Sequence, residues 1–144
     1  RPVFSLELLD KIKEKNPNGA YKMQVSELFY SAGDPEVSQI YQGLKVEVKG
    51  QVRTQPGEEQ NKAVKRLYRM FVTCCATDMQ PWPVKLKLSE QIAKSFSFEE
   101  HTWVVVEGTM SYEVGKDGVK RAVIEVNAIE RTAEPKNSFL SQGG

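Results

Sequence analysis

The sequence predicts a mainly β domain: a five-stranded OB-like Greek-key barrel with a helix between strands three and four, preceded by a mixed α/β extension. Three observations support this fold class. From residue 44 onward, apolar and polar residues alternate in several runs, which is the period of half-buried strands. One helical pattern interrupts these runs, and a Gly-Lys-Asp-Gly turn joins the last two. This order matches the OB fold; another antiparallel barrel or a sandwich is the alternative.

The length and charge of the chain fit one neutral domain. The chain has 144 residues, with 20 Lys and Arg against 19 Asp and Glu, so composition makes no case for a nucleic acid or an acidic membrane as partner. We expect one domain over residues 1–133, with an N-terminal extension over 1–42 and the barrel core over 43–131. Residues 134–144, which include Pro135 and two terminal glycines, are expected to be a flexible tail.

Short helices and one short strand are predicted in the extension. Ser5 is a plausible N-cap for a helix whose apolar residues follow helical spacing, and this helix should end at an Asn-Pro-Asn-Gly turn. Alternation over residues 21–25 predicts a strand. Ser26 is then expected to cap a helical turn over residues 27–30, and a further helical turn is expected over Pro35–Tyr41.

The first three barrel strands follow from period-two patterns. Residues 44–53 form the first, in which Gly50 suggests a bulge or a barrel corner. Residues 68–77 form the second, and residues 84–88 the third. For the second strand, the expected inward face is Tyr68, Met70, Val72, Cys74 and Ala76, and the expected outward face is Arg69, Phe71, Thr73, Cys75 and Thr77.

A helix and a long hairpin complete the barrel. Ser89 is the expected N-cap of a short helix that reaches to Phe98. Two long strands, over about Trp103–Val114 and Val119–Arg131, are joined by the Gly-Lys-Asp-Gly turn.

Cys74 and Cys75 are the chain's two cysteines and are adjacent. Neighbours on a strand point to opposite sides, so Cys74 should lie in the core and Cys75 outside. A disulfide between them is disfavoured, because consecutive Cα atoms lie about 3.8 Å apart, below the usual window of about 4.4–6.8 Å. If the strand ends or bulges here, both thiols could bind zinc, copper(I) or a metalloid, with Asp78 and His101 as further ligands. Otherwise Cys74 is a small buried hydrophobe.

The stretch Arg69–Asp78, with the pattern R-x4-C-C-x2-D, is followed by Pro81, Pro83-Val84 and later Trp103–Gly108. Together these residues resemble the YcgQ-like family of domains of unknown function, and the resemblance covers about residues 43–131. It implies the water-soluble C-terminal part of a bacterial membrane-anchored protein, placed outside the cytoplasmic membrane beside a permease subunit. It implies no settled activity.

These observations favour a non-enzymatic accessory or ligand-binding domain. The candidate ligand-binding residues are Arg69, Cys75 and Asp78, because a nearby guanidinium favours a thiolate or holds an anion. The candidate metal ligands are Cys74, Cys75, Asp78 and His101, and the cofactor that they would suit is a thiophilic metal ion.

Two alternatives remain open. An enzyme is disfavoured because the chain has one His and lacks a Gly-rich phosphate loop, HExxH and GxSxG, although Cys75 with His101 as base is formally possible. An OB-fold single-stranded nucleic-acid-binding protein would use an outward basic face with stacking aromatics. Its cations would be Lys45, Lys49, Arg53, Arg69, Lys85 and Lys87, and its aromatics would be Phe71 and Trp82.

Overall fold

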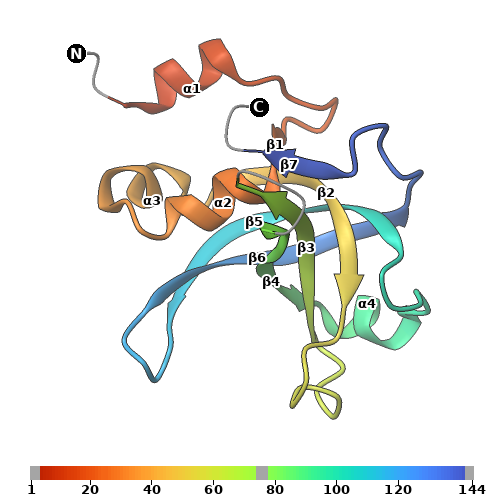
Figure 1. Cartoon of the computed structure of the whole chain (residues 1–144). Helices are drawn as coiled ribbons and strands as arrows, with labels where there is room; N and C mark the ends of the chain where they lie inside the picture. The colour runs from red at the N-terminus through yellow and green to blue at the C-terminus, as the bar shows by residue number, and fades with distance from the viewer. Residues whose placement is uncertain (1–3, 74–77, 142–144) are drawn as a thin grey trace.

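Figure 1 shows the computed structural model of the chain, which describes residues 4–73 and 78–141. Its helices are α1 (Leu6–Ile12), α2 (Val25–Ser31), α3 (Pro35–Tyr41) and α4 (Glu90–Ser95). Its strands are β1 (Tyr21–Met23), β2 (Lys45–Arg53), β3 (Val64–Val72), β4 (Gln80–Leu88), β5 (Trp103–Val114), β6 (Lys120–Arg131) and β7 (Phe139–Ser141). Among the described residues, no helix is both long enough and apolar enough to cross a membrane.

Five of the strands close into a barrel. The hydrogen-bonded order is β1-β2-β5-β6-β4-β3-β7, and an additional pairing of β2 with β3 joins the ring. Within the ring, β4 and β6 run parallel, whereas the other neighbours are antiparallel. This is the strand order of the OB fold, and α4 lies between the third and fourth barrel strands. The prediction of a mainly β, OB-like barrel is confirmed.

Strand β2 shows how the alternation builds the core. Val46, Val48 and Val52 are at most 1% exposed, and each fully buried side chain of this size contributes about 1.5–3 kcal/mol. Gly50 lies where β2 leaves β5 and begins to pair with β3. A Cβ at Gly50 would lie 2.9 Å from the carbonyl oxygen of Tyr68, so the close approach of β3 at this corner requires glycine.

The inward face of β3 differs from the expected one. Leu67 is fully buried in the core, and Phe71, which is in phase with it, is 3% exposed. Of the expected inward residues, Met70 and Val72 are partly exposed, whereas Tyr68 is buried at 6% exposure. None of the three belongs to the core cluster, and Phe71 does not belong to it either. Both faces of this strand carry apolar side chains, so alternation alone did not determine its phase.

In sequence, the two cysteines fall after the end of β3 and before the start of β4. β3 ends at Val72, and β4 begins at Gln80, which pairs with Phe71. The expected continuation of the second strand falls on residues 74–77, outside the described residues. The predicted faces of Cys74 and Cys75 therefore stay predictions.

The helices of the extension begin at identifiable caps. The Ser5 side chain accepts a hydrogen bond from the Leu8 N–H, which confirms the predicted start of α1. Helix α2 begins earlier than predicted, because Gln24 is its N-cap and forms a capping box with Glu27. Ser26 therefore lies inside α2 and does not cap it. Strand β1 pairs in parallel with β2 and ties the extension to the barrel.

Part of the segment expected to be a flexible tail forms a strand. β7 pairs in parallel with β3, with Leu140 opposite Phe71, and Leu140 is 6% exposed. Burial of this leucine against the barrel offsets the entropy cost of ordering the segment.

Candidate functional site

A cavity of about 630 Å³ lies between α2, the strands β3 and β4, and the start of β6. In OB folds, the second and third barrel strands and the loops after the first and fourth strands form the ligand face. Here those strands are β3 and β4, and those loops are residues 54–63 and 115–119. We call this cavity the basic cleft. Its aromatic and cationic lining residues are Phe29, Tyr30, Arg66, Lys85, Lys120 and Arg121.

The aromatic side of the basic cleft is backed by a stack of rings. Phe29 lies over Trp82 with ring centroids 4.8 Å apart, and Trp82 lies over Phe71 at 3.7 Å. Tyr30 meets the edge of Trp82 at 4.7 Å. Phe29 and Tyr30 remain 39% and 57% exposed, so the two rings of α2 line the cleft while Trp82 and Phe71 support them.

Two prolines lie in the part of β4 that is paired on one side only. Pro81 and Pro83 flank Trp82, and they lie in the part of β4 that pairs with β3 but not with β6, whose pairing begins at Lys85. A proline has no N–H to donate, so it is tolerated where one side of a strand is unpaired. Helix α2 packs against β4, with its Phe29 and Tyr30 rings against Trp82.

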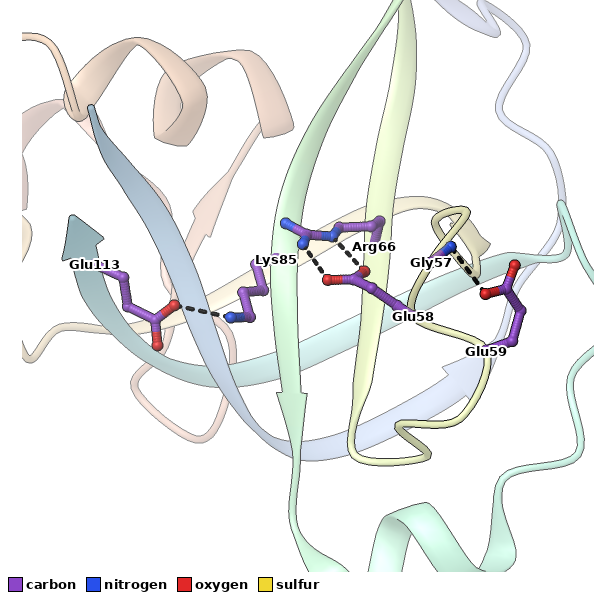
Figure 2. Close-up of polar contacts among 6 residues, drawn as sticks. All are labelled: Gly57, Glu58, Glu59, Arg66, Lys85 and Glu113. Carbon is purple, nitrogen blue, oxygen red and sulfur yellow. Dashed lines mark hydrogen bonds and ion pairs between the residues drawn. The ribbon is translucent and has the colours of Figure 1, made fainter. Parts of the chain in front are cut away.

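The cationic side of the cleft combines two strands and the hairpin. Arg66 and Lys85 are cross-strand partners on β3 and β4. Figure 2 shows that each of them is paired with a carboxylate, Arg66 with Glu58 and Lys85 with Glu113. Arg66 donates to Glu58 through Nε at 3.0 Å and Nη2 at 2.5 Å, and Lys85 Nζ lies 2.9 Å from Glu113. Glu58 belongs to the loop after β2, so this ion pair also fixes that loop against the barrel.

Lys120 differs from the other cleft cations. Its Nζ donates to the Ser38 hydroxyl at 2.7 Å and lies 5.0 Å from the centre of the Tyr112 ring. Within residues 4–73 and 78–141, no carboxylate forms an ion pair with it. An ammonium has three donors, so Lys120 keeps donors available after its bond to Ser38.

The carboxylates around the cleft are ionised at neutral pH. Hydrogen bonds from Arg121 lower the pKa of Asp117 to about 2, and those from Lys87 and Lys85 hold the pKa of Glu113 below its usual range. These carboxylates lie outside the cleft lining, whose described residues include no Asp or Glu. The lining is therefore basic, with its charge partly neutralised from behind.

A second hollow of about 840 Å³ lies between the loop after β2 and α4. Its lining mixes the acids Glu59 and Glu90 with lysines such as Lys62 and Lys94. The charges alternate in sign and most of these side chains are exposed. This hollow therefore has no charge character that would select a ligand.

Arg69, a predicted ligand-binding residue, does not lie outward and does not line the basic cleft. It is 7% exposed, and burial lowers the pKa of its guanidinium. Nη2 donates to the backbone oxygen of Asn137 at 2.9 Å, and the guanidinium lies 5.1 Å from the centre of the Trp103 ring. Its Nε is buried without a hydrogen-bond partner in the described chain.

Two other predicted site residues, His101 and Asp78, do not line the basic cleft. His101 lies in the loop before β5, where its Nδ1 and the Tyr68 hydroxyl are 2.5 Å apart. Asp78 lies two residues before β4 begins, whereas Cys74 and Cys75 lie outside the described residues. Within the described ranges, no three His, Cys, Asp or Glu side chains gather as a metal site would require. The metal site proposed from the sequence is therefore not tested by these residues.

Sequence reasoning missed most of the basic cleft. Lys85 was named as an outward cation, but Tyr30 and Lys120 were not singled out. Two adjacent aromatic residues on a seven-residue helix are one available signal, because they cannot both face the same core. The pair Lys120-Arg121 directly after the hairpin turn is another.

Comparison with solved structures finds distant likenesses. The small single-stranded DNA-binding protein from Streptomyces coelicolor is 13% identical with a TM-score of 0.40, over 62% of this chain and 94% of that one. A DUF3299 family protein from Pseudomonas aeruginosa PAO1 is 13% identical with a TM-score of 0.44, over 94% and 86% of the two chains. A putative aspartyl-tRNA synthetase from Leishmania major Friedlin is 13% identical with a TM-score of 0.46, over 86% of this chain and 23% of the synthetase. These likenesses are too distant to argue function.

Sequence comparison identifies the family. No curated protein matches the chain. Residues 15–141 match the DUF1980 C-terminal domain, a match that takes in β1, all five barrel strands and β7. The chain belongs to the DUF1980 C-terminal domain family.

Proposed function

We propose that this DUF1980 C-terminal domain is a non-catalytic binding module that holds a small anionic ligand in the basic cleft. One observation carries the proposal: four cationic side chains line a cavity on the ligand face of an OB-like barrel, and no described lining residue is acidic. An anion that enters this cavity exchanges water for charge-assisted hydrogen bonds.

Lys120 is the main anchor in this proposal. Arg66, Lys85 and Arg121 each have a carboxylate partner, so a ligand must share them. Lys120 has a neutral partner, the hydroxyl of Ser38. Its full charge is therefore available to the ligand, and the ring of Tyr112 beneath it limits the positions that it adopts.

A binding role fits the cleft better than catalysis does. The described lining offers amines, guanidinium groups and rings, and it includes no His, Asp, Glu or Ser. His, Asp and Glu are the most frequent general acids and bases at neutral pH, whereas anion binding needs none of them.

The resemblance to the YcgQ-like proteins supports an accessory role. In this proposal the domain is carried outside the cytoplasmic membrane by an anchored parent protein and acts beside a permease subunit. Co-purification of the full-length protein with the product of a neighbouring permease gene tests the association. Recovery of the permease in equal amount with a parent protein that lacks this domain would contradict it.

The nucleic-acid alternative has less support from the described residues. It needs exposed stacking aromatics, but Phe71 is 3% exposed and lies behind Trp82. Lys85 and Lys87 both pair with Glu113. Phe71, Lys85 and Lys87, three of the parts named for a strand-binding face, are therefore occupied by contacts within the domain.

The test of the anion site is an NMR titration of the whole chain with inorganic pyrophosphate at low salt. We expect amide shifts that map to the hairpin and to α2, and affinity that falls as salt is added. Lys120→Ala should weaken binding by about ten-fold or more, the effect of removing a hydrogen bond to a charged group. Lys49→Ala, at an exposed position on β2, is the charge-matched control. Shifts elsewhere, or equal affinities for both variants, would remove the proposal.

The cysteine pair gives a separate proposal that rests on the sequence alone. A thiophilic metal ion at Cys74 and Cys75, with Asp78 and His101, is tested by thiol titration and metal analysis of protein purified without chelator. If one thiol is functional, we expect it to be Cys75, the one that strand alternation predicts to lie outside the core. Two unreactive thiols and no bound metal would leave the pair structural.

A further inference from the structure

The basic cleft presents aromatic surface that the domain itself does not cover. Tyr30 is 57% exposed and Phe29 is 39% exposed, although both line a cavity. Behind them the rings of Trp82 and Phe71 are stacked at 12°, so the wall is preorganised and a flat ligand loses little free energy in ordering it. Exposed rings on a rigid support are the usual stacking partners of planar ligands.

The rings of Phe29 and Tyr30 and the ammonium-bearing side chain of Lys120 line one cavity. Tyr30 comes from α2, whereas Lys120 begins β6, and Lys120 reaches back to Ser38 on α3. The cavity volume of about 630 Å³ is in the range of sites that enclose one small organic ligand, about 300–1,000 Å³. A ligand with a ring at one end and an anion at the other would meet both features.

The surrounding carboxylates limit how far the ligand extends. Glu58, Glu113 and Asp117 form ion pairs with Arg66, Lys85 and Arg121 and do not line the cleft. A chain of phosphates that continued beyond the cleft would pass these negative charges, which repel it. One anionic group near Lys120 avoids them.

We propose that the ligand of the basic cleft is a small molecule in which a planar ring is joined to a phosphate group. This proposal rests on the proposed anion site. The ring lies against Tyr30 and Phe29, and the phosphate accepts hydrogen bonds from Lys120 and shares Arg121. A nucleoside monophosphate and an aryl phosphate both have this chemistry.

Tryptophan fluorescence offers a direct measurement, because the chain has two tryptophans and one of them, Trp82, supports the ring wall. In a Trp103→Phe background, Trp82 alone reports binding. The probes are naphthyl phosphate, inorganic phosphate and naphthol. We expect naphthyl phosphate to bind at least about ten-fold more tightly than either half, because both contacts then add to one binding event.

Matched variants separate the ring from the charge. Tyr30→Ala should weaken naphthyl phosphate at least about five-fold more than it weakens inorganic phosphate, whereas Tyr30→Phe, which keeps the ring, should show no such difference between the two probes. Lys120→Ala should weaken both phosphates. Tyr30→Leu keeps apolar bulk on α2 without a ring, so the loss should persist in it even if the alanine variant is unstable.

Each other outcome has one meaning. Equal affinities for the two phosphates, both reduced in Lys120→Ala, would keep the anion site and overturn the ring proposal. No binding of either phosphate would overturn both. A nucleoside monophosphate that binds more tightly than naphthyl phosphate would support the proposal and identify the nucleotide source. Tighter binding of an oligothymidylate than of either small phosphate would overturn it in favour of a nucleic-acid strand.

Discussion

The guanidinium of Arg69 donates a hydrogen bond to the backbone oxygen of Asn137 across 2.9 Å. This bond fastens β3 to the segment that leads into β7, two residues before that strand begins. Because β7 then pairs with β3, the C-terminal segment belongs to the folded unit.

Leu140→Ala should therefore destabilise the whole domain. The side chain is 6% exposed, and removal of a buried leucine costs about 2–5 kcal/mol; we expect the lower end, because β7 lies at the edge of the sheet. The neighbouring Phe139 is 41% exposed, so Phe139→Ala is the control and should cost less. Urea unfolding measures both. Equal, small losses would show that β7 adds nothing to stability.

Glycine at position 108 should be required for the pairing of β5 with β6. A Cβ there would lie 2.3 Å from the backbone oxygen of Glu125, which cannot move without breaking the ladder. We expect Gly108→Ala to lower the free energy of unfolding by about 3 kcal/mol or more, and Gly50→Ala by about 1–2 kcal/mol. Gly33→Ala, whose Cβ would meet only an oxygen at 3.7 Å, should change it by about 0.5 kcal/mol or less. Thermal unfolding with all three variants measures the order.

Tyr112 should act as a positioning residue for Lys120. Its ring lies beneath the Lys120 ammonium, and its hydroxyl hydrogen-bonds to Ser31 at 2.7 Å. Tyr112→Phe keeps the ring, so pyrophosphate affinity should be unchanged while stability falls by about 1 kcal/mol. Tyr112→Leu removes the ring, and affinity should fall about three-fold or more. An affinity loss in the phenylalanine variant would assign the effect to the hydroxyl instead.

Glu113 should contribute to acid sensitivity. Its pKa is lowered by hydrogen bonds from Lys87 and Lys85, so the folded state holds the ionised form more strongly than the unfolded chain does. The stabilisation is present above the unfolded pKa of about 4.3 and is lost as pH falls through the lower, folded pKa. Glu113→Gln should therefore flatten the decline of Tm below about pH 5.

The control for this measurement is Glu130→Gln. Glu130 is exposed on β6 and forms no ion pair within the described residues. If both variants follow the wild-type pH profile, the two lysines do not stabilise the Glu113 carboxylate in solution.

Local patterns predicted most of the barrel. Ser5 and Ser89 cap helices as expected because a cap depends on a side chain and an N–H three residues away. The Gly-Lys-Asp-Gly turn joins β5 to β6 with Gly118 at φ +79°, a conformation that glycine adopts readily. The start of α2 was misplaced, because a glutamine replaced the more usual serine as its cap. The inward face of β3 and the pairing of β7 were not predicted either.

Local sequence patterns were enough to predict the succession of strands and helices along the chain and the alternation of β2, since both depend on residues that are near one another in the chain. Tertiary structure alone decided which face of β3 is inward, because that choice depends on the closure of β2 onto β3. The tertiary structure also determined which residues line the basic cleft. Tyr30 and Lys120 lie far apart in sequence, and they line one cavity only because α2 contacts both β4 and β6 and these two strands are paired.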